Sequence, residues 1–179
     1  REGDTSHSEI DYPLSTYLVA LCAGPYHEVT DTWRGELTEH PEGKPAQKLE
    51  VPLGIYCRAS LADSLDAERL FTETKQGFDF YHRNFGFPYP FGKYDQIFVP
   101  EFNAGAMENA GCVTIRDEYV FTSQATHYKY ERRADTILHE LAHMWFGDLV
   151  TMQWWDDLWL NESFATWSAA IAQAEATEF

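Results

Sequence analysis

The chain has 179 residues and a net charge of −16, from 13 basic and 29 acidic side chains. A surface this acidic repels phosphate, which excludes nucleic acid as an expected partner. The sequence has no apolar run of 18 residues and no apolar leader near its start. We therefore expect no membrane span, no signal peptide and a cytoplasmic location.

The cysteines, Cys22, Cys57 and Cys112, lack the CxxC spacing of metal and redox sites. We expect them to be small buried side chains in a reducing compartment. The chain begins with Arg rather than Met, and it ends inside a pattern typical of a helix. Both ends lead us to expect a fragment of a longer protein.

The first apolar run is TYLVALCAGPY, residues 16–26. It predicts a strand that is buried on both faces. Residues 27–50 are mixed and polar, with a turn expected at EHPEGKP, and a domain boundary is expected near residues 26–31. The next segment, KLEVPLGIYCRA, alternates enough to predict one or two strands.

The segment SLADSLDAERLFTETKQGFDFYHRNFG predicts a long amphipathic helix. Its apolar stripe has helical spacing and consists of Leu70, Phe71, Thr74, Phe78, Tyr81 and Phe85. Asp63, Ser64 or Asp66 would cap its start, and Gly86 fits the position just after its end. His82 has no partner at ligand spacing, so we expect a structural role for it. A short strand, QIFVPEF, should follow.

Residues 103–111 read NAGAMENAG, a run of small residues around one acid. Small residues let the backbone approach another chain closely, and an extended segment can bind a peptide as an added strand. Glu108 could then pair with a terminal ammonium. Taken alone the signal is weak, because the alternative is an ordinary glycine-containing loop. CVTIRDEYVF, residues 112–121, predicts a further strand.

The segment ILHELAHMWF carries His139 and His143 four residues apart. On a helix these imidazoles share one face and can converge on a divalent metal, most often zinc. Glu140 projects beside them and can reach a metal-activated water. Glu162, at the start of the helical pattern ESFATWSAAIAQAEA, is the best third ligand. The alternative is a helix with two ordinary histidines.

Two features around the histidines complete the expected helix pair. Gly147 is expected to stop the first helix. The connection GDLVTMQWWDDLWL contains Trp154, Trp155 and Trp159, which we expect to pack between the helices. Asn161 opens a glycosylation sequon, which we reject because Glu162 should be buried at the metal.

HELAHMW followed by WLNES, with GAMEN upstream, resembles the zinc aminopeptidases of the M1 family, a group of gluzincins. The resemblance covers nearly the whole chain. It implies an α+β fold, with residues 29–179 as an incomplete thermolysin-like half-domain. Residues 1–28 would be a β-strand remnant of an N-terminal β domain, and the flanking domains of the parent would be missing.

The resemblance also implies roles for particular residues. One zinc ion would be held by His139, His143 and Glu162, with Glu140 as general base. The partner would be a peptide with a free N-terminus, whose α-amine Glu108 binds. The substrate would lie along six consecutive residues: Ala104, Gly105, Ala106, Met107, Glu108 and Asn109.

In the family a tyrosine stabilises the oxyanion, and its usual position lies beyond Phe179. We therefore expect the fragment to be weakly active or inactive. Three alternatives stay open: a zinc endopeptidase, an epoxide-opening relative, and a non-catalytic metal-binding fragment.

Overall fold

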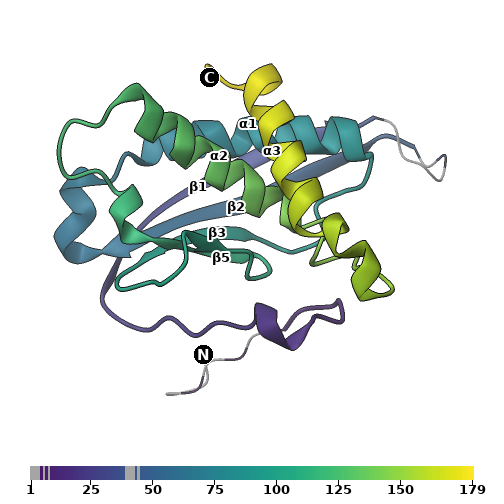
Figure 1. The fold of residues 1–179 in the computed structure, drawn as a ribbon, viewed down its shortest axis with the longest axis horizontal. Helices are drawn as coiled ribbons and strands as arrows, with labels where there is room; N and C mark the ends of the chain where they lie inside the picture. The colour runs from purple at the N-terminus through teal and green to yellow at the C-terminus, as the bar shows by residue number, and fades with distance from the viewer. Residues whose placement is uncertain (1–4, 6, 8, 39–42, 44) are drawn as a thin grey trace.

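The structure is a computed structural model that describes residues 5, 7, 9–38, 43 and 45–179. Within these residues, a five-stranded mixed sheet packs with three α-helices (Figure 1). In sheet order, the strands are β1 (Tyr26–Leu37), β2 (Gln47–Arg58), β3 (Tyr94–Val99), β5 (Cys112–Arg116) and β4 (Ala106–Met107). The α-helices are α1 (Ala67–Phe85), α2 (His127–His143) and α3 (Glu162–Ala176). The short 3-10 helices are η1 (Thr16–Leu18), η2 (Ala59–Ser64), η3 (Asp117–Tyr119) and η4 (Trp155–Leu160).

The sheet has a parallel centre and antiparallel edges. β2, β3 and β5 run parallel to one another, β1 pairs antiparallel with β2, and β4 pairs antiparallel with β5. The three α-helices lie together on one side of the sheet, and the N-terminal segment through η1 runs along the other side (Figure 1). The core therefore fills the space between the helices and one face of the sheet.

The amphipathic stripe of α1 packs on this inner face as its spacing predicts. The Phe78 ring lies 5.5 Å from the ring of Tyr94 on β3, and the Gln96 side chain donates a hydrogen bond of 2.7 Å to the Thr74 hydroxyl. Gly86 ends the helix with a left-handed φ of 64°. Asp66 occupies the N-cap position, but its side chain accepts no capping hydrogen bond.

His82 is structural, as expected. Its ring stacks on Trp33 of β1 with centroids 4.4 Å apart, and Nε2 accepts a hydrogen bond of 3.0 Å from the Tyr89 backbone N–H. The expected strands over residues 48–59, 96–102 and 112–121 are also confirmed in β2, β3 and β5, although β3 begins and ends earlier and β5 gives way to η3 after Arg116.

The predicted strand over residues 16–26 is wrong. Thr16–Leu18 form the 3-10 helix η1, and the chain reaches a strand only at Tyr26. Leu18 is buried against the outer side of the sheet, whereas Val19 and Leu21 are 77% and 93% exposed. An apolar run indicates only a tendency toward burial, and here the segment has a packing partner on one side alone.

Strand β1 replaces the irregular stretch expected after residue 26. Its burial alternates weakly, with Trp33 and Leu37 as its buried apolar residues. β1 lies at the edge of the sheet, where one polar face is tolerated, so its apolar content gives a poor strand signal. The expected turn over residues 39–45 falls mostly outside the described residues.

Gly147 does not stop the helix that carries His139 and His143 in the way predicted. α2 ends at His143 with Met144 as its C-cap, and Gly147 lies farther on with φ of 122°. The expected packing role of the connection is also wrong, because Trp154, Trp155 and Trp159 are 66%, 67% and 54% exposed.

The cysteines are all free, but only Cys57 is fully buried, while Cys22 and Cys112 are half-buried. In the part of the chain that the structure describes, no helix combines the length and the apolar character needed to cross a bilayer.

Candidate active site

The first two site residues stand on α2. This helix starts after Thr126, whose hydroxyl accepts a hydrogen bond of 3.4 Å from the Lys129 N–H. The apolar face of α2 packs in the core, and this packing fixes the orientation of the opposite face, which carries His139 and His143. His139 and His143, one turn apart, bring their Nε2 atoms to 3.0 Å from each other.

Glu162, the first residue of α3, completes a cluster with these histidines. Its Oε2 lies 3.3 Å from Nε2 of His139 and 3.6 Å from Nε2 of His143. The expectation that Glu162 is buried is wrong, since its side chain is 64% exposed while that of His143 is fully buried. The cluster therefore lies where the C-terminal end of α2 meets the N-terminal end of α3, and solvent reaches it on the side of Glu162.

The contacts in this cluster shift the pKa values of Glu162 and His143. Hydrogen bonds from His139 and His143 hold the pKa of Glu162 well below its usual range. Burial alone would lower the pKa of His143, but the hydrogen bond to Glu162 and the charges of Glu108 and Glu140 outweigh it and raise that pKa to about 9. Two imidazole nitrogens and one carboxylate oxygen, all within 4.8 Å of one another, form a donor set suited to zinc.

Glu140 lies beside this cluster in a buried position. Its side chain is 6% exposed, and its Oε2 has no hydrogen-bond partner among the described residues. Burial, with the charges of Glu108 and Glu162, raises its pKa to about 8 despite the opposing effect of His143. A carboxylate with a raised pKa is a stronger proton acceptor than a free one, which suits it to general-base chemistry.

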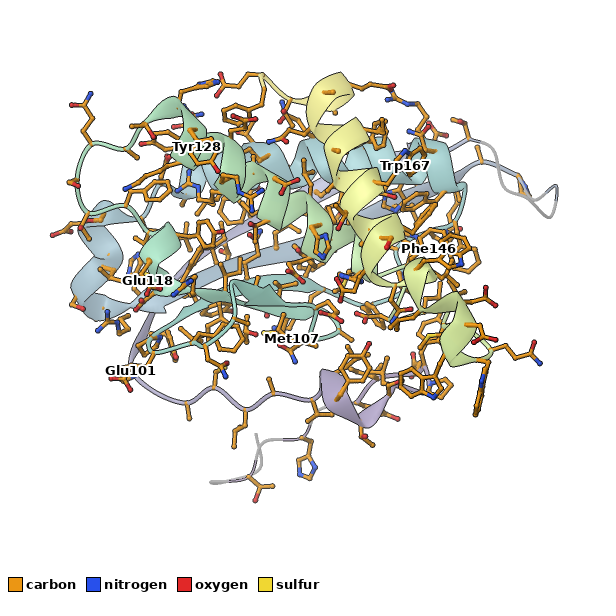
Figure 2. The ribbon with its side chains drawn as sticks, viewed as in Figure 1. Glu101, Met107, Glu118, Tyr128, Phe146 and Trp167 are labelled. Carbon is orange, nitrogen blue, oxygen red and sulfur yellow. The ribbon has the colours of Figure 1, made fainter. Side chains whose placement is uncertain are left out.

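Glu108 approaches from a different part of the fold. It directly follows β4, whose Ala106 and Met107 stand opposite Ile115 and Thr114 of β5. Met107 lies on the β4–β5 hairpin (Figure 2). Single ligand atoms of Glu108, Glu140 and His143, all buried, lie within 4.8 Å of one another. The edge strand β4 thus places Glu108 beside Glu140 and His143, near the C-terminal end of α2.

Backbone hydrogen bonds hold the rest of the GAMEN segment, residues 105–109, in place. The Arg116 N–H donates 3.0 Å to the Gly105 carbonyl, and the Cys112 N–H donates 2.9 Å to the Asn109 carbonyl. Ala104 and Gly105 are exposed, whereas Asn109 is buried. β4 is the last strand of the described sheet, so its outer edge is available to an added strand.

The structure brings two further residues to the site that the sequence analysis missed. Asp148 is 4% exposed and has no hydrogen-bond partner for either oxygen among the described residues; burial and the charge of Glu108 raise its pKa to about 8. Partial burial and the charges of Glu108, Asp148 and Glu162 raise the pKa of Tyr17 to about 12. The position of Asp148, an acid soon after an apolar helical segment, could have indicated a site residue from the sequence. Nothing in the sequence indicated Tyr17.

Comparisons with known proteins identify the family of this chain. The sequence profile of the Peptidase family M1 domain matches residues 70–178. The "Aminopeptidase N" of Streptomyces lividans is 61% identical over 163 residues, which are 91% of this chain and 18% of the relative. The mouse "Aminopeptidase N" is 45% identical over 156 residues, 86% of this chain and 15% of the relative.

A relative with a different name is the "Tricorn protease-interacting factor F2" of Thermoplasma acidophilum, 39% identical over 154 residues, 86% of this chain and 17% of the relative. The chain therefore spans less than a fifth of the length of these relatives. Since the profile covers more than half of its residues, the chain belongs to peptidase family M1.

Proposed function

We propose that this chain carries the catalytic centre of a zinc-dependent aminopeptidase, which releases the N-terminal amino acid from peptides. The proposal depends above all on one observation: two buried acids, Glu108 and Glu140, meet beside the cluster of His139, His143 and Glu162. The names of the relatives support a peptidase that acts on free N-termini. Because the chain spans less than a fifth of those relatives, the activity is proposed for the full-length chain that carries this sequence.

We propose that His139, His143 and Glu162 hold one zinc ion. The two imidazoles and one carboxylate fit zinc, and the exposed side of Glu162 leaves room for a further ligand. A zinc ion held there would polarise the scissile carbonyl and lower the pKa of water. Glu140 would take the proton from the attacking water and deliver it to the leaving amine.

In this proposal Glu108 binds the α-ammonium of the substrate. Its buried carboxylate can form a charge-assisted hydrogen bond with an ammonium group, which restricts cleavage to the first peptide bond. The backbone of Gly105–Asn109 would line the extended substrate, and Ala104 would line the pocket for its first side chain.

We further propose that residues 29–179 are the first part of a thermolysin-like catalytic domain and that residues 1–28 end a preceding β domain. The small sheet with ligand helices on one side supports the first part. The boundary falls within β1, which starts at Tyr26.

The first experiment measures zinc content and turnover of L-leucine 4-nitroanilide in the full-length chain and its Glu140→Ala variant. We expect one zinc per chain in both proteins and a loss of turnover of at least about a hundredfold in the variant. Glu131→Ala, a change on the same helix away from the cluster, should keep both properties. Equal turnover in Glu140→Ala and wild type would contradict the role of Glu140, and absence of zinc would contradict the ligand set.

A zinc endopeptidase is the main competing function, because it would use the same metal ligands and general base. Glu108 distinguishes the two, since an acid buried at this place is best paired by a free ammonium. Glu108→Gln should therefore reduce kcat/KM for peptides with a free amine by about a hundredfold. Efficient cleavage of an N-acetylated peptide by the wild type would favour the endopeptidase instead.

A further inference from the structure

The first turn of α3 contacts both nitrogens of the His139 ring. Oε2 of Glu162, the first residue of α3, lies 3.3 Å from Nε2 of His139. The hydroxyl oxygen of Thr166, one turn later on the same helix, lies 3.4 Å from Nδ1 of the same ring. Nε2 also faces His143, so it is the nitrogen on the side of the cluster. Thr166 therefore meets the nitrogen that a bound metal would leave free.

The hydroxyl of Thr166 is oriented differently from those of the other threonines in the described α-helices. Thr72, Thr74 and Thr136 each donate a hydrogen bond to the backbone carbonyl four residues earlier, at 2.8, 2.7 and 2.9 Å. A helical threonine has that carbonyl within reach. The Thr166 side chain instead has Nδ1 of His139 as its hydrogen-bond partner.

The packing of α3 sets the position of Thr166. The helix buries three small side chains completely in the core: Ala165, Ala169 and Ala172. The Gln173 side-chain amide donates a hydrogen bond of 2.7 Å to the Glu131 carbonyl of α2, which fixes one helix along the other. Thr166 lies between these contacts and the cluster, so its backbone is held close to His139.

The two histidines differ in the group that meets Nδ1. Nδ1 of His143 lies 3.0 Å from the Phe146 carbonyl, which only accepts hydrogen bonds. In this contact Nδ1 carries the hydrogen, so the neutral ring keeps a lone pair on Nε2 for a metal. A hydroxyl both donates and accepts, and it can therefore accept from Nδ1–H of His139 in the tautomer that leaves Nε2 free. Thus a backbone group orients His143, whereas a side chain orients His139.

We propose that Thr166 is a positioning residue for His139, whose hydroxyl accepts the hydrogen bond from Nδ1–H and directs the Nε2 lone pair toward the cluster. This inference rests on the proposed zinc site. Partners of the second nitrogen of a metal-bound histidine fix the ring and its tautomer, and their loss typically weakens metal binding by about 10- to 100-fold. Thr166 is exposed and its hydroxyl is neutral, so we expect the lower end of this range.

The test measures the zinc affinity of the full-length chain by competition with the chromogenic chelator pyridylazoresorcinol. Thr166→Val keeps the shape of the side chain and removes the hydroxyl, so we expect about tenfold weaker zinc binding. Thr166→Ser keeps the hydroxyl and should stay within about twofold of the wild type. Thr72→Val makes the same change on α1 and should leave the affinity unchanged.

A second readout reports the geometry of the site rather than its affinity. Cobalt(II) in place of zinc gives visible absorption bands that depend on the arrangement of the ligands. Thr166→Val should shift these bands, because the His139 ring is then free to rotate. Thr166→Ser should keep the wild-type spectrum.

A double-mutant cycle shows whether Thr166 acts through His139. In a His139→Ala background, Thr166→Val should cause no further loss of zinc affinity. Wild-type affinity in Thr166→Val, or an equal loss in Thr166→Ser, would overturn the inference while the zinc site stands. If His139→Ala itself keeps the wild-type affinity, the proposed ligand set fails first. Thr166→Ala also lacks the hydroxyl and should repeat the loss, and equal melting temperatures of the metal-free proteins exclude a general effect on folding.

Discussion

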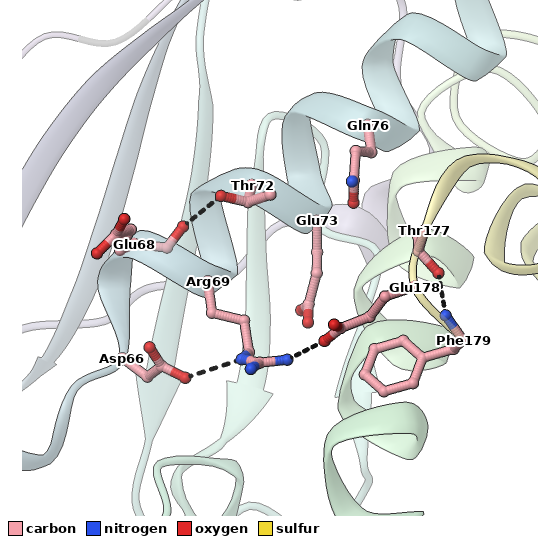
Figure 3. Close-up of a pocket in the computed structure, with 9 residues that line it drawn as sticks. All are labelled: Asp66, Glu68, Arg69, Thr72, Glu73, Gln76, Thr177, Glu178 and Phe179. Atoms are coloured by element: carbon pink, nitrogen blue, oxygen red, sulfur yellow. Dashed lines mark hydrogen bonds and ion pairs between the residues drawn. The ribbon is translucent and has the colours of Figure 1, made fainter. Parts of the chain in front are cut away.

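Glu73 is a buried acid whose ionisation should make the stability of the fold depend on pH. Its side chain is 4% exposed, and neither oxygen has a hydrogen-bond partner among the described residues. It points into a cavity of about 380 Å³ beside Arg69 and Glu178 (Figure 3). Burial raises its pKa from 4.5 to about 7; Arg133 and Arg69 oppose this shift, and the negative charges nearby support it.

Replacing Glu73 by Gln should change how stability depends on pH. The folded protein prefers the protonated carboxyl, so wild-type stability is complete below pH 4.5 and falls as the pH rises to about 7. Glu73→Gln lacks this loss, so its free energy of unfolding should exceed that of the wild type by up to about 3 kcal/mol at pH 8. Urea unfolding at pH 4 to 8 measures the difference.

Glu68→Gln is the control for this experiment, because Glu68 is exposed on the same helix. Its stability should follow that of the wild type at every pH. If the curves for Glu73→Gln and wild type stay parallel between pH 4 and 8, ionisation of Glu73 does not destabilise the fold.

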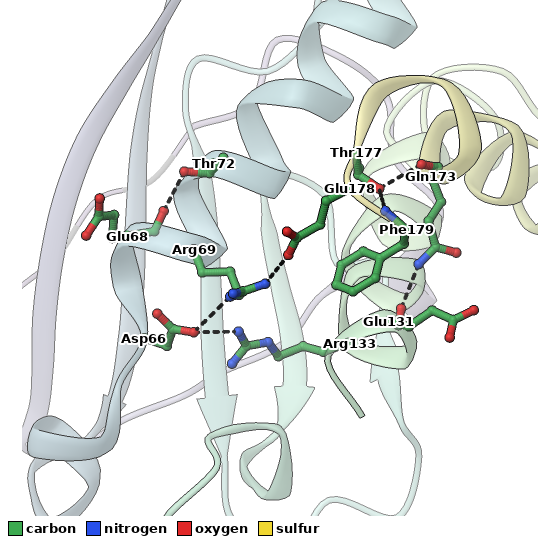
Figure 4. A network of polar contacts seen from close by, with 10 residues as sticks. All are labelled: Asp66, Glu68, Arg69, Thr72, Glu131, Arg133, Gln173, Thr177, Glu178 and Phe179. Carbon is green, nitrogen blue, oxygen red and sulfur yellow. Dashed lines mark hydrogen bonds and ion pairs between the residues drawn. The ribbon is translucent and has the colours of Figure 1, made fainter. Parts of the chain in front are cut away.

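Arg133 joins two helices through a buried charge. Its Nη2 lies 3.0 Å from Oδ2 of Asp66 at the start of α1, although α2 carries Arg133 itself. The guanidinium also lies over the rings of Phe121 and Tyr130, at 5.0 and 5.2 Å. Figure 4 shows that Asp66 pairs with both Arg133 and Arg69, and that Arg69 also pairs with Glu178. These contacts connect α1, α2 and the segment after α3.

Truncating Arg133 to Ala should destabilise the protein by about 3 kcal/mol, because it removes buried packing and leaves Asp66 without this partner. The neighbouring Arg132→Ala is a matched control, since Arg132 is half-exposed and pairs with Asp135 on the surface. It should cost less than about 1 kcal/mol. Thermal unfolding of both variants measures the difference, and equal losses would contradict the importance of the buried contact.

The sequence predicted the parts of the fold that depend on local spacing. The stripe from Leu70 to Phe85 indicates α1, and the four-residue spacing of His139 and His143 already places both imidazoles on one face of α2. The same reasoning predicted β2, β3 and β5, because their apolar residues are concentrated in short runs. In each case, the residues that decide the structure are close together in the chain.

The failures concern contacts between distant segments. Whether residues 16–26 form a strand depends on what lies beside them, and only their side toward the sheet has a partner. The tryptophans from Trp154 to Trp159 are equally apolar whether a neighbour covers them or not. For the same reason, Tyr17 could not be assigned to the site, because no pattern in its own segment indicates that it lies near Glu108.

The exposed aromatic residues of the connection before α3 form an apolar surface, together with Leu158 at 45% exposure. Trp167 on α3 is also 58% exposed (Figure 2). Apolar surface of this kind is typical of regions that bind other protein surfaces. The net charge of −16 opposes self-association, so we expect dye binding rather than precipitation for the 179-residue chain in dilute buffer.

Replacing Trp154, Trp155 and Trp159 by Gln should therefore reduce the fluorescence of a bound apolar dye, such as anilinonaphthalene sulfonate, by at least about half. Their exposure means that little packing is lost, so the melting temperature should change by no more than a few degrees. A large fall in melting temperature would show instead that these rings support the fold. Dye titration and calorimetry on the same samples separate the two outcomes.

The Asn109 side-chain amide donates a buried hydrogen bond of 3.0 Å to the Leu18 carbonyl, and this contact bears on the order in which the molecule folds and opens. Contacts across 91 positions must first overcome the entropy of closing a long loop, so they form after the β1–β2 hairpin and α1, which are local. In the native state, the turn Thr16–Leu18 should detach at a lower free energy than the sheet, and its amides should exchange with solvent before those of β3. Brief undocking of this short turn would then break its hydrogen bond to Asn109, the residue after Glu108, while the rest of the chain stays folded.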